Sequence, residues 1–527
     1  MNQPLEANGP DKPTLGSRLL GAEFPHPVEN EELIETHISW VVLTGRFAYK
    51  FKKPVDLGFV DYSTIELRHQ NCLRELEING VWAADIYLDV VPVFESGERL
   101  RIGRHDESAG DGERLIDHAV RMRQFDQESL LSRRLKAGQV TPQMTEMLAG
   151  DLAELHHRAT AVPYDSELVS RGAIEPAQDN FVYLLKSFQG AGDDRASDDV
   201  NRLAVLRDWS EEQIEKIRPL LEKRASTGRV RQCHGDLHLD NLLHIDGRFV
   251  PFDAIEFNDR LREVEGLSET AFLAMELSEH GFVSHARRLL NRYVEAANDY
   301  QGLTVLRFFL VYRAMVRAKV DRIRQLQGDA SESDPASRPE ALSPTARDYV
   351  AYAERLVAPQ SAELWLTYGP SGSGKSTRAG QVVESRGFFR IRADVQRKLL
   401  AGIDPFRKST DEEAAELYSA EMTRRTYAHL LRLAEQILAA GFGVIVDATF
   451  LHRDQRRPFF DLARRQGVTP RVLVCDGEES ELRSRIAARG VDPSDASAEL
   501  ISNQLASAEP LSGDELSAVV AGSDSGG

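Results

Sequence analysis

The sequence predicts an α+β domain followed by an α/β domain, and three observations support this prediction. Two short strand patterns, at 40–43 and 47–52, precede a helix pattern over 65–82, and from about residue 126 the apolar residues repeat at helical spacing. A segment at 328–344 is rich in Ser, Pro, Asp and Ala, which is typical of a linker. Beyond it, strand and helix patterns alternate, which indicates a parallel sheet covered by helices.

The length and composition exclude several classes of protein. At roughly 150 residues per domain, the 527 residues amount to about three to four folding units or two large ones. The 65 Lys and Arg against 83 Asp and Glu give a net charge of −18, which makes nucleic acid an unfavourable partner. The three cysteines have no CxxC spacing, so neither a disulfide framework nor a zinc site is indicated. Because no signal peptide and no run of about 18 apolar residues occurs, we expect a cytoplasmic protein without a membrane partner.

A glycine-rich motif follows the strand pattern at 363–368 and opens a helix pattern. Residues 369–376 (GPSGSGKS) match G-x-x-x-x-G-K-[ST], a loop whose backbone N–H groups cradle phosphates. We expect Lys375 to reach the β- and γ-phosphates and Ser376 to bind Mg²⁺. The alternative is a glycine-rich turn with a purely structural role. The predicted phosphate cradle consists of Gly369, Pro370, Ser371, Gly372, Ser373, Gly374, Lys375, Ser376 and Thr377.

Acidic residues after the next two strand patterns extend this candidate site. Asp394 and Arg397 lie about one helical turn apart and so share one face of a helix. The carboxylate could take a proton from an acceptor hydroxyl while Arg397 holds the acceptor; the alternative is a helix cap beside a solvated arginine. Asp447 ends the apolar pattern 442–447, where such an acid orders Mg²⁺ in P-loop enzymes, unless it merely ends the strand.

A further group of arginines suggests a lid. Arg483, Arg485 and Arg489 precede a break at 492–495, and Arg485 and Arg489 could close on the transferring phosphate; a solvated basic helix face is the alternative. With its glycine-rich loop and its Asp-x-x-Arg pair, the region from 363 to about 510 resembles the small-molecule P-loop kinases. This group includes gluconate kinase, zeta toxin and polynucleotide 5′-kinase.

A second motif lies in the first half of the chain, at 233–241 (CHGDLHLDN). Asn241 follows Asp236 by five residues, which is the spacing of the kinase catalytic loop, where the Asp orients the acceptor hydroxyl and the Asn holds Mg²⁺. Asp253 follows a hairpin pattern with a turn at Asp246-Gly247 and supplies a second metal carboxylate. A transition-metal site is the alternative, formed by His234, His238 and His244.

This segment resembles the aminoglycoside phosphotransferase and choline kinase superfamily, whose loop has the form H-G-D-x-x-x-x-N with a later I-D or F-D. The resemblance covers about 37–324, and the whole chain resembles the bacterial two-domain proteins called bifunctional aminoglycoside phosphotransferase/ATP-binding proteins. It implies a protein-kinase-like bilobal fold in which Lys50 grips the α- and β-phosphates and Glu75 pairs with that lysine. Lys52 and Glu77 are the alternatives for these two roles, and a solvated helix face is the alternative for both acids.

These patterns and resemblances divide the chain into five segments. They are an N-terminal extension (1–30), an aminoglycoside phosphotransferase-like kinase domain (31–327, with an N-lobe to about 125 and a helical C-lobe from about 126), a linker (328–345), a P-loop kinase-like domain (346–510) and a flexible tail (511–527). The predicted fold class is therefore an α+β protein-kinase-like bilobal domain followed by an α/β P-loop domain with a parallel sheet covered by helices.

The function that these features predict is that of an ATP- and Mg²⁺-dependent kinase with two transfer sites. Each site would move the γ-phosphoryl group onto a hydroxyl of a small molecule, with Asp236 and Asp394 orienting or activating the acceptors. One alternative is that the kinase-like half senses nucleotide and regulates the other half, because Glu265 and Glu269 stand where relatives usually have aspartates. Another is a 5′-hydroxyl nucleic-acid kinase in the P-loop half. The sequence names neither acceptor.

Overall fold

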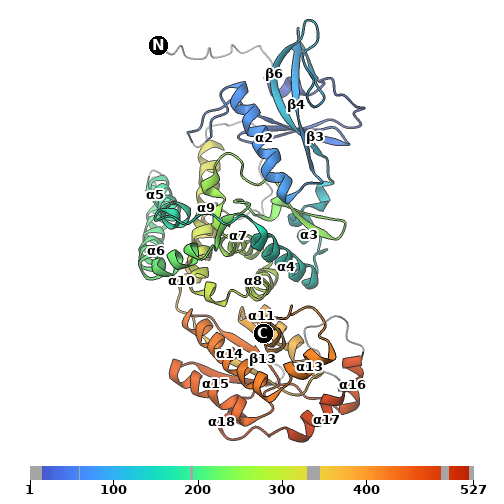
Figure 1. Cartoon of the computed structure of the whole chain (residues 1–527). Helices are drawn as coiled ribbons and strands as arrows, with labels where there is room; N and C mark the ends of the chain where they lie inside the picture. Colours follow the sequence, from blue (N-terminus) through green and yellow to red (C-terminus); the bar gives the residue numbers. More distant parts are fainter. Residues whose placement is uncertain (1–14, 59, 190–193, 329–344, 488–497, 521–527) are drawn as a thin grey trace. The chain divides into compact units, whose positions relative to one another are not determined.

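The computed structural model describes residues 15–58, 60–189, 194–328, 345–487 and 498–520 (Figure 1). The chain divides into two compact units. The first unit consists of Met1–Gln139, Thr160–Val162 and Val230–Glu265, and the second of Val140–Ala159, Pro163–Arg229 and Gly266–Gly527. Helices before the predicted linker thus share a unit with the P-loop part, and residues 329–344 of that linker lie outside the described residues.

The first unit is built on a six-stranded antiparallel sheet with the order β1-β2-β3-β6-β4-β5 (Figure 1). The strands are β1 Glu32–Glu35, β2 Ser39–Leu43, β3 Phe47–Lys52, β4 Tyr87–Ser96, β5 Arg99–Ile102 and β6 Arg114–Arg123. Strands β2 and β3 confirm the two predicted strand patterns. Along β3, Tyr49 and Phe51 pack into the core on one face of the sheet and Ala48 into the core on the other. Because strand side chains alternate, Lys50 and Lys52 lie on the same face as Ala48.

Helix α2 (Ile65–Trp82) covers the lysine-bearing face of this sheet and confirms the predicted helix. It begins at Thr64, whose side chain accepts a hydrogen bond from the Leu67 N–H and so satisfies one free donor of the first turn. Cys72 packs from the helix into the core under the sheet. Arg68 donates through Nε to both carboxylate oxygens of Asp117 on β6, each at 2.9 Å, and this buried ion pair fixes the helix to the strand.

The segment with the second motif is also part of the first unit. Strand β7 (Val230–Gln232) pairs with β10 (Glu263–Glu265), and a short 3₁₀ turn precedes the hairpin of β8 (Leu242–Ile245) and β9 (Arg248–Pro251). Asp246 and Gly247 have φ values of 50° and 76°, which a type I′ turn requires at its two central positions. The structure therefore confirms the predicted hairpin and its turn.

The second unit begins as a bundle of helices. They are α4 Pro142–Arg158, α5 Glu175–Gln189, α6 Asp194–Ser226, α7 Gly266–Glu279, α8 Val283–Ala296, α9 Leu303–Gly328 and α10 Ala346–Val357. Helix α4 starts as its sequence predicts, with Thr141 as the N-cap and Pro142 in the first turn. Helix α7 is buried along nearly its whole length, and α8 and α9 pack against it. Within the described ranges, no helix combines the length and apolar character that crossing a membrane requires.

The same unit continues as a parallel sheet with the order β12-β13-β11-β14. Its strands are β11 Glu363–Tyr368, β12 Phe389–Arg392, β13 Val444–Asp447 and β14 Thr469–Val474. Its larger helices are α11 Lys375–Arg386, α14 Ala420–Ala439 and α15 Arg453–Gln466. All four residues of β13 are buried, as expected of a central strand covered on both faces. This order of elements confirms the predicted fold class, an α+β kinase-like part followed by an α/β P-loop part.

The C-terminal segment differs from the predicted flexible tail at 511–527. Residues 511–520 contain helix α18 (Asp514–Ser517), and the Val520 N–H donates to the Val472 carbonyl on β14, while 521–527 lie outside the described residues. The fully buried guanidinium of Arg456 on α15 pairs with Glu515 at 2.8 Å and donates to the Phe450 carbonyl at 2.9 Å. This ion pair holds a Ser- and Gly-rich segment whose composition alone predicts fraying.

We expect Arg456→Ala to destabilise the P-loop part strongly, because it leaves the Glu515 carboxylate and backbone carbonyls buried without their donor. Breaking a buried ion pair from one side costs about 3–5 kcal/mol. Arg457→Ala is the matched control, because it removes the neighbouring arginine, whose side chain is 78% exposed. The urea midpoints of the two variants test this expectation, and equal midpoints would contradict it.

Candidate functional site

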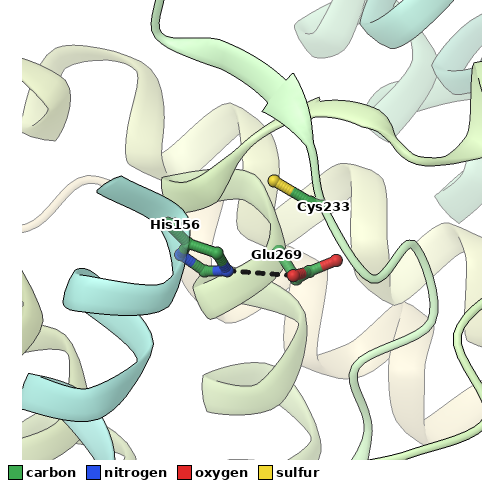
Figure 2. Close-up of side chains that lie close together, drawn as sticks. All are labelled: His156, Cys233 and Glu269. Carbon is green, nitrogen blue, oxygen red and sulfur yellow. Dashed lines mark hydrogen bonds and ion pairs between the residues drawn. The ribbon is translucent and has the colours of Figure 1, made fainter. Parts of the chain in front are cut away.

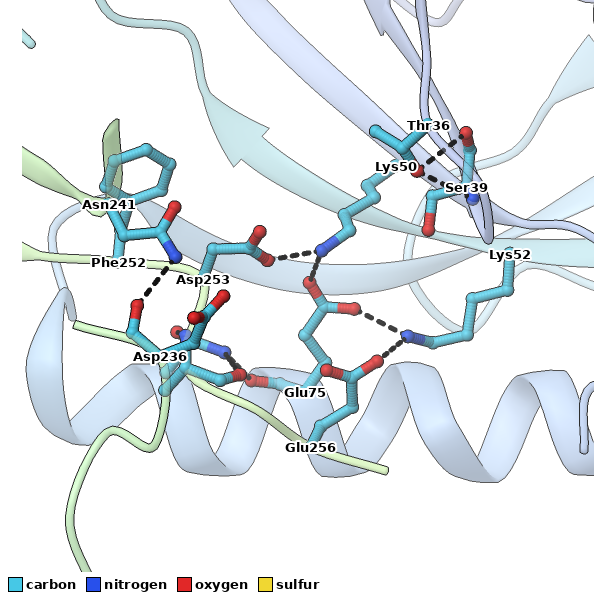
Figure 3. A network of polar contacts seen from close by, with 12 residues as sticks. Thr36, Ser39, Lys50, Lys52, Glu75, Asp236, Asn241, Phe252, Asp253 and Glu256 are labelled. Carbon is cyan, nitrogen blue, oxygen red and sulfur yellow. Dashed lines mark hydrogen bonds and ion pairs between the residues drawn. The ribbon is translucent and has the colours of Figure 1, made fainter. Parts of the chain in front are cut away.

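Lys50 occupies the centre of a polar cluster in the first unit (Figure 3). Its Nζ donates to Glu75 Oε1 at 2.8 Å and to Asp253 Oδ1 at 2.5 Å. Burial opposes the charge on Lys50, but the Asp253 and Glu75 carboxylates outweigh this effect and raise its pKa well above the ordinary value. Lys50 is therefore a charged group that lies directly beside the predicted metal carboxylate.

Lys52, the alternative to Lys50, lies deeper on the same face of β3. Its side chain is 1% exposed and donates to Glu75 Oε2 at 2.8 Å and to Glu256. The Tyr62 hydroxyl donates to the same Glu256 oxygen at 2.8 Å. Lys52 thus links helix α2 to the segment that follows Asp253, and it contacts a different carboxylate of that segment from Lys50.

Between the two candidate glutamates, the structure places Glu75 at the lysines and Glu77 on the exposed side of α2. Glu75 is fully buried, and each of its carboxylate oxygens binds a different lysine. Burial alone would raise its pKa, but Lys50 and Lys52 lower the pKa of Glu75 to about 2. Glu75 is consequently ionised at neutral pH although no part of it reaches solvent.

The predicted catalytic loop brings Asp236, Asn241 and Asp253 to the same region (Figure 3). Asn241 Nδ2 donates to the Asp236 carbonyl at 3.0 Å, and the Phe252 N–H donates to the Asn241 carbonyl at 3.0 Å. Asp253 has a φ of 61°, in the left-handed region, and its N–H donates to the Tyr87 hydroxyl at 3.2 Å. The side chains of Asp236 and Asp253 are 41% and 43% exposed, so a ligand can reach both carboxylates.

The three histidines near this loop take separate partners. His234 Nε2 shares a hydrogen bond with the Phe252 carbonyl at 2.8 Å, His238 lies 3.5 Å from Asp236, and the His244 ring packs on Phe249. This arrangement does not support the transition-metal alternative. The oxygen atoms of Asn241 and Asp253 instead fit a hard cation such as Mg²⁺.

Glu269, one of the two acids that motivated the sensing alternative, lies in the second unit on α7. It is buried and hydrogen-bonded to His156 Nε2 at 2.9 Å (Figure 2). The other ring nitrogen of His156 lies 2.9 Å from the Tyr293 hydroxyl. These contacts fix α4, α7 and α8 to one another, which gives Glu269 a packing role.

The glycine-rich loop at 369–376 connects β11 to α11, as the motif predicts. A Cβ on Gly369 would lie 1.8 Å from the Cys475 carbonyl, and Gly374 caps the helix with a φ of 82°, so both positions demand glycine. Lys375 Nζ donates to the Pro370 carbonyl at 2.6 Å. The loop thus wraps back over its own lysine at the N-terminus of α11, where backbone N–H groups favour an anion.

A pocket of about 420 Å³ joins this loop to the predicted acceptor residues. Its lining includes Ser371, Gly372, Gly374, Lys375, Ser376, Thr377, Asp394, Arg397 and Asp447. Arg397 is 7% exposed and donates to the Leu417 carbonyl at 2.8 Å and to Thr423 Oγ1 at 3.1 Å, so its charge is held in place. The structure thus brings six of the nine predicted cradle residues together with Asp394, Arg397 and Asp447 in one cavity, while Gly369, Pro370 and Ser373 do not line it.

Asp447, at the end of β13, has the properties expected of a residue that binds magnesium. It is buried, and its Oδ2 atom has no hydrogen-bond partner. Burial raises the pKa of Asp447, which Arg390, Lys375 and a hydrogen bond from Ser376 partly oppose. A carboxylate oxygen and a hydroxyl at the foot of a phosphate-binding loop are ligands that Mg²⁺ prefers.

The lid arginines do not reach this pocket within the described residues. Arg485 is exposed on α16 (Glu479–Ala487) and pairs with Glu481 at 3.2 Å, while Arg483 pairs with Glu479. This is the solvated helix face that we consider as the alternative, and it results from acids four residues before each arginine. Arg489 lies outside the described residues.

Several residues that line the pocket are not predicted by the sequence analysis. Helix α17 (Ala498–Ser507) contributes Gln504, whose Oε1 accepts a hydrogen bond from the Ser371 N–H at 2.8 Å. Arg392, at the end of β12, could have been found from its position two residues before Asp394. The remaining unpredicted polar residues of the pocket include Tyr418, Thr423, Tyr427, Thr449, His452, Gln455, Asn503 and Ser507.

Comparison with known proteins finds a family model that matches part of the chain, related sequences and similar solved structures. Residues 364–511 match the model of a family described as an AAA domain, which covers the P-loop part. Uncharacterized proteins of Mycobacterium tuberculosis and Mycobacterium bovis are 29% identical to this chain over 482 residues, or 90% of each chain.

The similar solved structures cover different shares of the chain. A sugar kinase from Janibacter covers 30% of this chain and 83% of its own, with 25% identity and a TM-score of 0.23. A choline/ethanolamine kinase family protein from Mesorhizobium loti covers 63% and 90%, with 13% identity and a TM-score of 0.36. A thermostable mutant of an aminoglycoside phosphotransferase covers 63% and 96%, with 14% identity and a TM-score of 0.36.

We expect Lys52→Met to destabilise the first unit far more than Lys50→Met. Loss of Lys52 leaves the buried carboxylates of Glu75 and Glu256 without their common cation, at a cost of about 3–5 kcal/mol. Lys50→Met removes the same charge from the same face, but Glu75 then keeps Lys52, and the other partner of Lys50, Asp253, is 43% exposed and can be hydrated. Urea unfolding of both variants provides the measurement.

The double variant Lys52→Met/Glu256→Gln should recover part of that loss, because it removes one of the two stranded charges. Equal midpoints for the two single lysine variants, or no recovery in the double variant, would show that Lys52 is not the buried link.

Proposed function

We propose that this chain is an enzyme with two phosphotransferase sites, each of which uses ATP and Mg²⁺ to phosphorylate a hydroxyl group of a small molecule. The observation that carries the proposal is the pocket of about 420 Å³, because Lys375, Ser376 and Asp447 line it together with Asp394 and Arg397. A protein that only binds nucleotide would not need an acid and an arginine beside the phosphate cradle.

In the P-loop site, the residues divide the work of an in-line transfer. Lys375 would exchange the Pro370 carbonyl for phosphate oxygens, and the N–H groups at the start of α11 would hold the same group. Asp394 would accept the proton of the acceptor hydroxyl. Mg²⁺, held by Ser376 and Asp447, would supply charge neutralisation for the phosphates.

The remaining lining of this pocket favours a small polar acceptor. Hydroxyl groups of Thr423, Tyr427 and Thr449, and the side chains of His452 and Gln455, can donate and accept hydrogen bonds. Arg397 adds a fixed positive charge, since the Leu417 carbonyl and Thr423 hold its guanidinium. A hydroxylated compound, neutral or anionic, matches this lining better than an apolar one.

In the first unit, the proposed roles follow from the contacts of the cluster around Lys50. Lys50 would bind phosphate oxygens while Glu75 retains its orientation, and Asp236 would orient the acceptor hydroxyl. Asn241 and Asp253 would hold Mg²⁺. The exposure of Asp236 and Asp253 leaves room for both substrates.

A nucleic-acid acceptor is not favoured by the surface beside the P-loop pocket. A neighbouring open groove shares His452 with the pocket and carries Arg453, Arg457 and Arg464. Four carboxylates line the same groove: Asp454, Glu509, Asp514 and Glu515. The mixed charge lacks the basic excess that binds a phosphate backbone.

The two sites can be tested separately with isotopically labelled ATP and a bacterial metabolite extract. We expect Asp394→Asn and Lys375→Ala to lower one set of labelled products, and Asp236→Asn to lower another, by about 10²–10⁴-fold. Mass spectrometry of the products measures both sets and identifies the acceptors. Asp111→Asn and Asp411→Asn serve as controls, because both acids are exposed and lie outside the proposed sites.

Labelling that persists in full in all three site variants would refute the proposal. If none of the labelled products of the wild type depended on Asp236, while ATP still stabilised the protein, the first unit would be a nucleotide sensor.

A further inference from the structure

Helix α8 supplies a carboxylate to the strand end that borders the P-loop pocket. Arg392 is the last residue of β12 and lines the pocket, and its Nε donates to Glu295 Oε1 on α8 at 2.6 Å. Its Nη2 donates to the other oxygen of the same carboxylate, so the pair is bidentate. The backbone of Arg392 is in register with Asp447 on β13. One buried acid therefore contacts the residue that stands beside the proposed metal ligand.

The Glu295–Arg392 pair is charged and largely removed from solvent. The side chains of Glu295 and Arg392 are 1% and 17% exposed. Burial would raise the pKa of Glu295, but Arg392, Arg390 and Arg292 lower it to about 2. Two charges in such a place add little net stability compared with packed apolar residues, whereas they fix the direction of the guanidinium.

Neighbouring contacts hold the same strand end at further points. Arg292, one turn before Glu295 on α8, lies 3.1 Å from that carboxylate and stacks over the Phe406 ring at 4.2 Å. Arg392 lies over the same ring at 5.8 Å. The Tyr300 hydroxyl donates to the Arg390 carbonyl at 3.4 Å. These contacts place the end of β12 against α8 and the turn after it.

Arg392 lies two residues before the proposed acceptor base, Asp394. Arg392 caps helix α12 (Ala393–Leu400) without a side-chain hydrogen bond to that helix, and Asp394 stands in the first turn. Its guanidinium binds the Glu295 carboxylate, so a residue outside α12 anchors the start of that helix. A displacement of Arg392 would be transmitted through two residues of backbone to Asp394.

We propose that Glu295 is a positioning residue of the P-loop site, which it serves by holding Arg392 and thereby the start of α12. This inference rests on the proposed function of that site. Glu295 lies outside residues 364–511, so the part that matches the AAA domain family does not contain its complete active site. The helical bundle before the linker completes it.

Two substitutions in the full chain test this role against a matched control. Glu295→Gln removes the charge that holds Arg392. Glu384→Gln removes a second ion pair of α8 with the P-loop part, to Arg288, which does not line the pocket. The assay is Lys375-dependent transfer of labelled phosphate from ATP into the metabolite extract, together with the dissociation constant of MgATP. Thermal unfolding of each variant is measured in parallel.

We expect Glu295→Gln to lower turnover at saturating ATP by at least tenfold and to change the MgATP dissociation constant by less than twofold. Glu384→Gln should leave both quantities within twofold of the wild type. Glu295→Asp, which keeps the charge, should restore part of the lost turnover. This split between turnover and binding would not arise from a general loss of packing.

Wild-type turnover in Glu295→Gln, or an equal loss in Glu384→Gln, would overturn the inference while leaving the proposed function intact. A parallel fall of MgATP affinity, turnover and unfolding temperature would also overturn it, because Glu295 would then be structural. Labelling that is unchanged in Lys375→Ala would refute the proposed function itself, and the inference with it.

Discussion

The carboxylate of Glu75 lies entirely inside the first unit, where an unmatched charge would cost on the order of several kcal/mol. The chain meets this constraint with two lysines placed two residues apart on β3, one for each oxygen. This arrangement fixes helix α2 against the sheet. It also fixes the loop after the hairpin, because Lys52 forms a second ion pair with Glu256 and Lys50 forms one with Asp253. The burial of Glu75 is thus connected through Lys50 to the proposed metal carboxylate of Asp253, whose backbone is also held by Tyr87.

The second unit uses the same principle at the ends of its parallel sheet. Glu295 on α8 pairs with Arg392 on β12, and Arg456 on α15 pairs with Glu515 on α18. In both pairs, an ion pair joins residues that are far apart in the sequence and holds the end of a strand or a loop against another element. Apolar contacts could hold these elements together, but they would not select one orientation of a side chain as a bidentate ion pair does.

The sequence predicts those parts of the two proposed sites whose residues belong to short motifs. The glycine-rich loop predicts β11, α11 and the placement of Lys375, and the spacing of Asp236 and Asn241 predicts the loop that precedes the hairpin. Glu256, Glu295 and Gln504 could not be predicted, because each meets its partner across more than 90 residues. The C-terminal segment shows the same limit, since its composition indicates fraying while Glu515 binds a buried arginine.

The two proposed phosphate-binding lysines contact different groups, and this difference bears on how each proposed site would respond to a ligand. Lys50 pairs with the carboxylate of Asp253, whereas Lys375 donates to the backbone carbonyl of Pro370. A phosphate that drew Lys50 away would leave the Asp253 carboxylate without this cation, so the binding of nucleotide and of a divalent cation would be coupled by charge at the first proposed site. At the P-loop site, the same exchange would release the Pro370 carbonyl, which solvent can satisfy, while Lys375 also acts electrostatically on Asp447. The hydrogen-bond acceptor that a phosphate would displace is therefore a carboxylate at one proposed site and a carbonyl at the other, although both proposed sites combine a lysine, an aspartate and oxygen ligands.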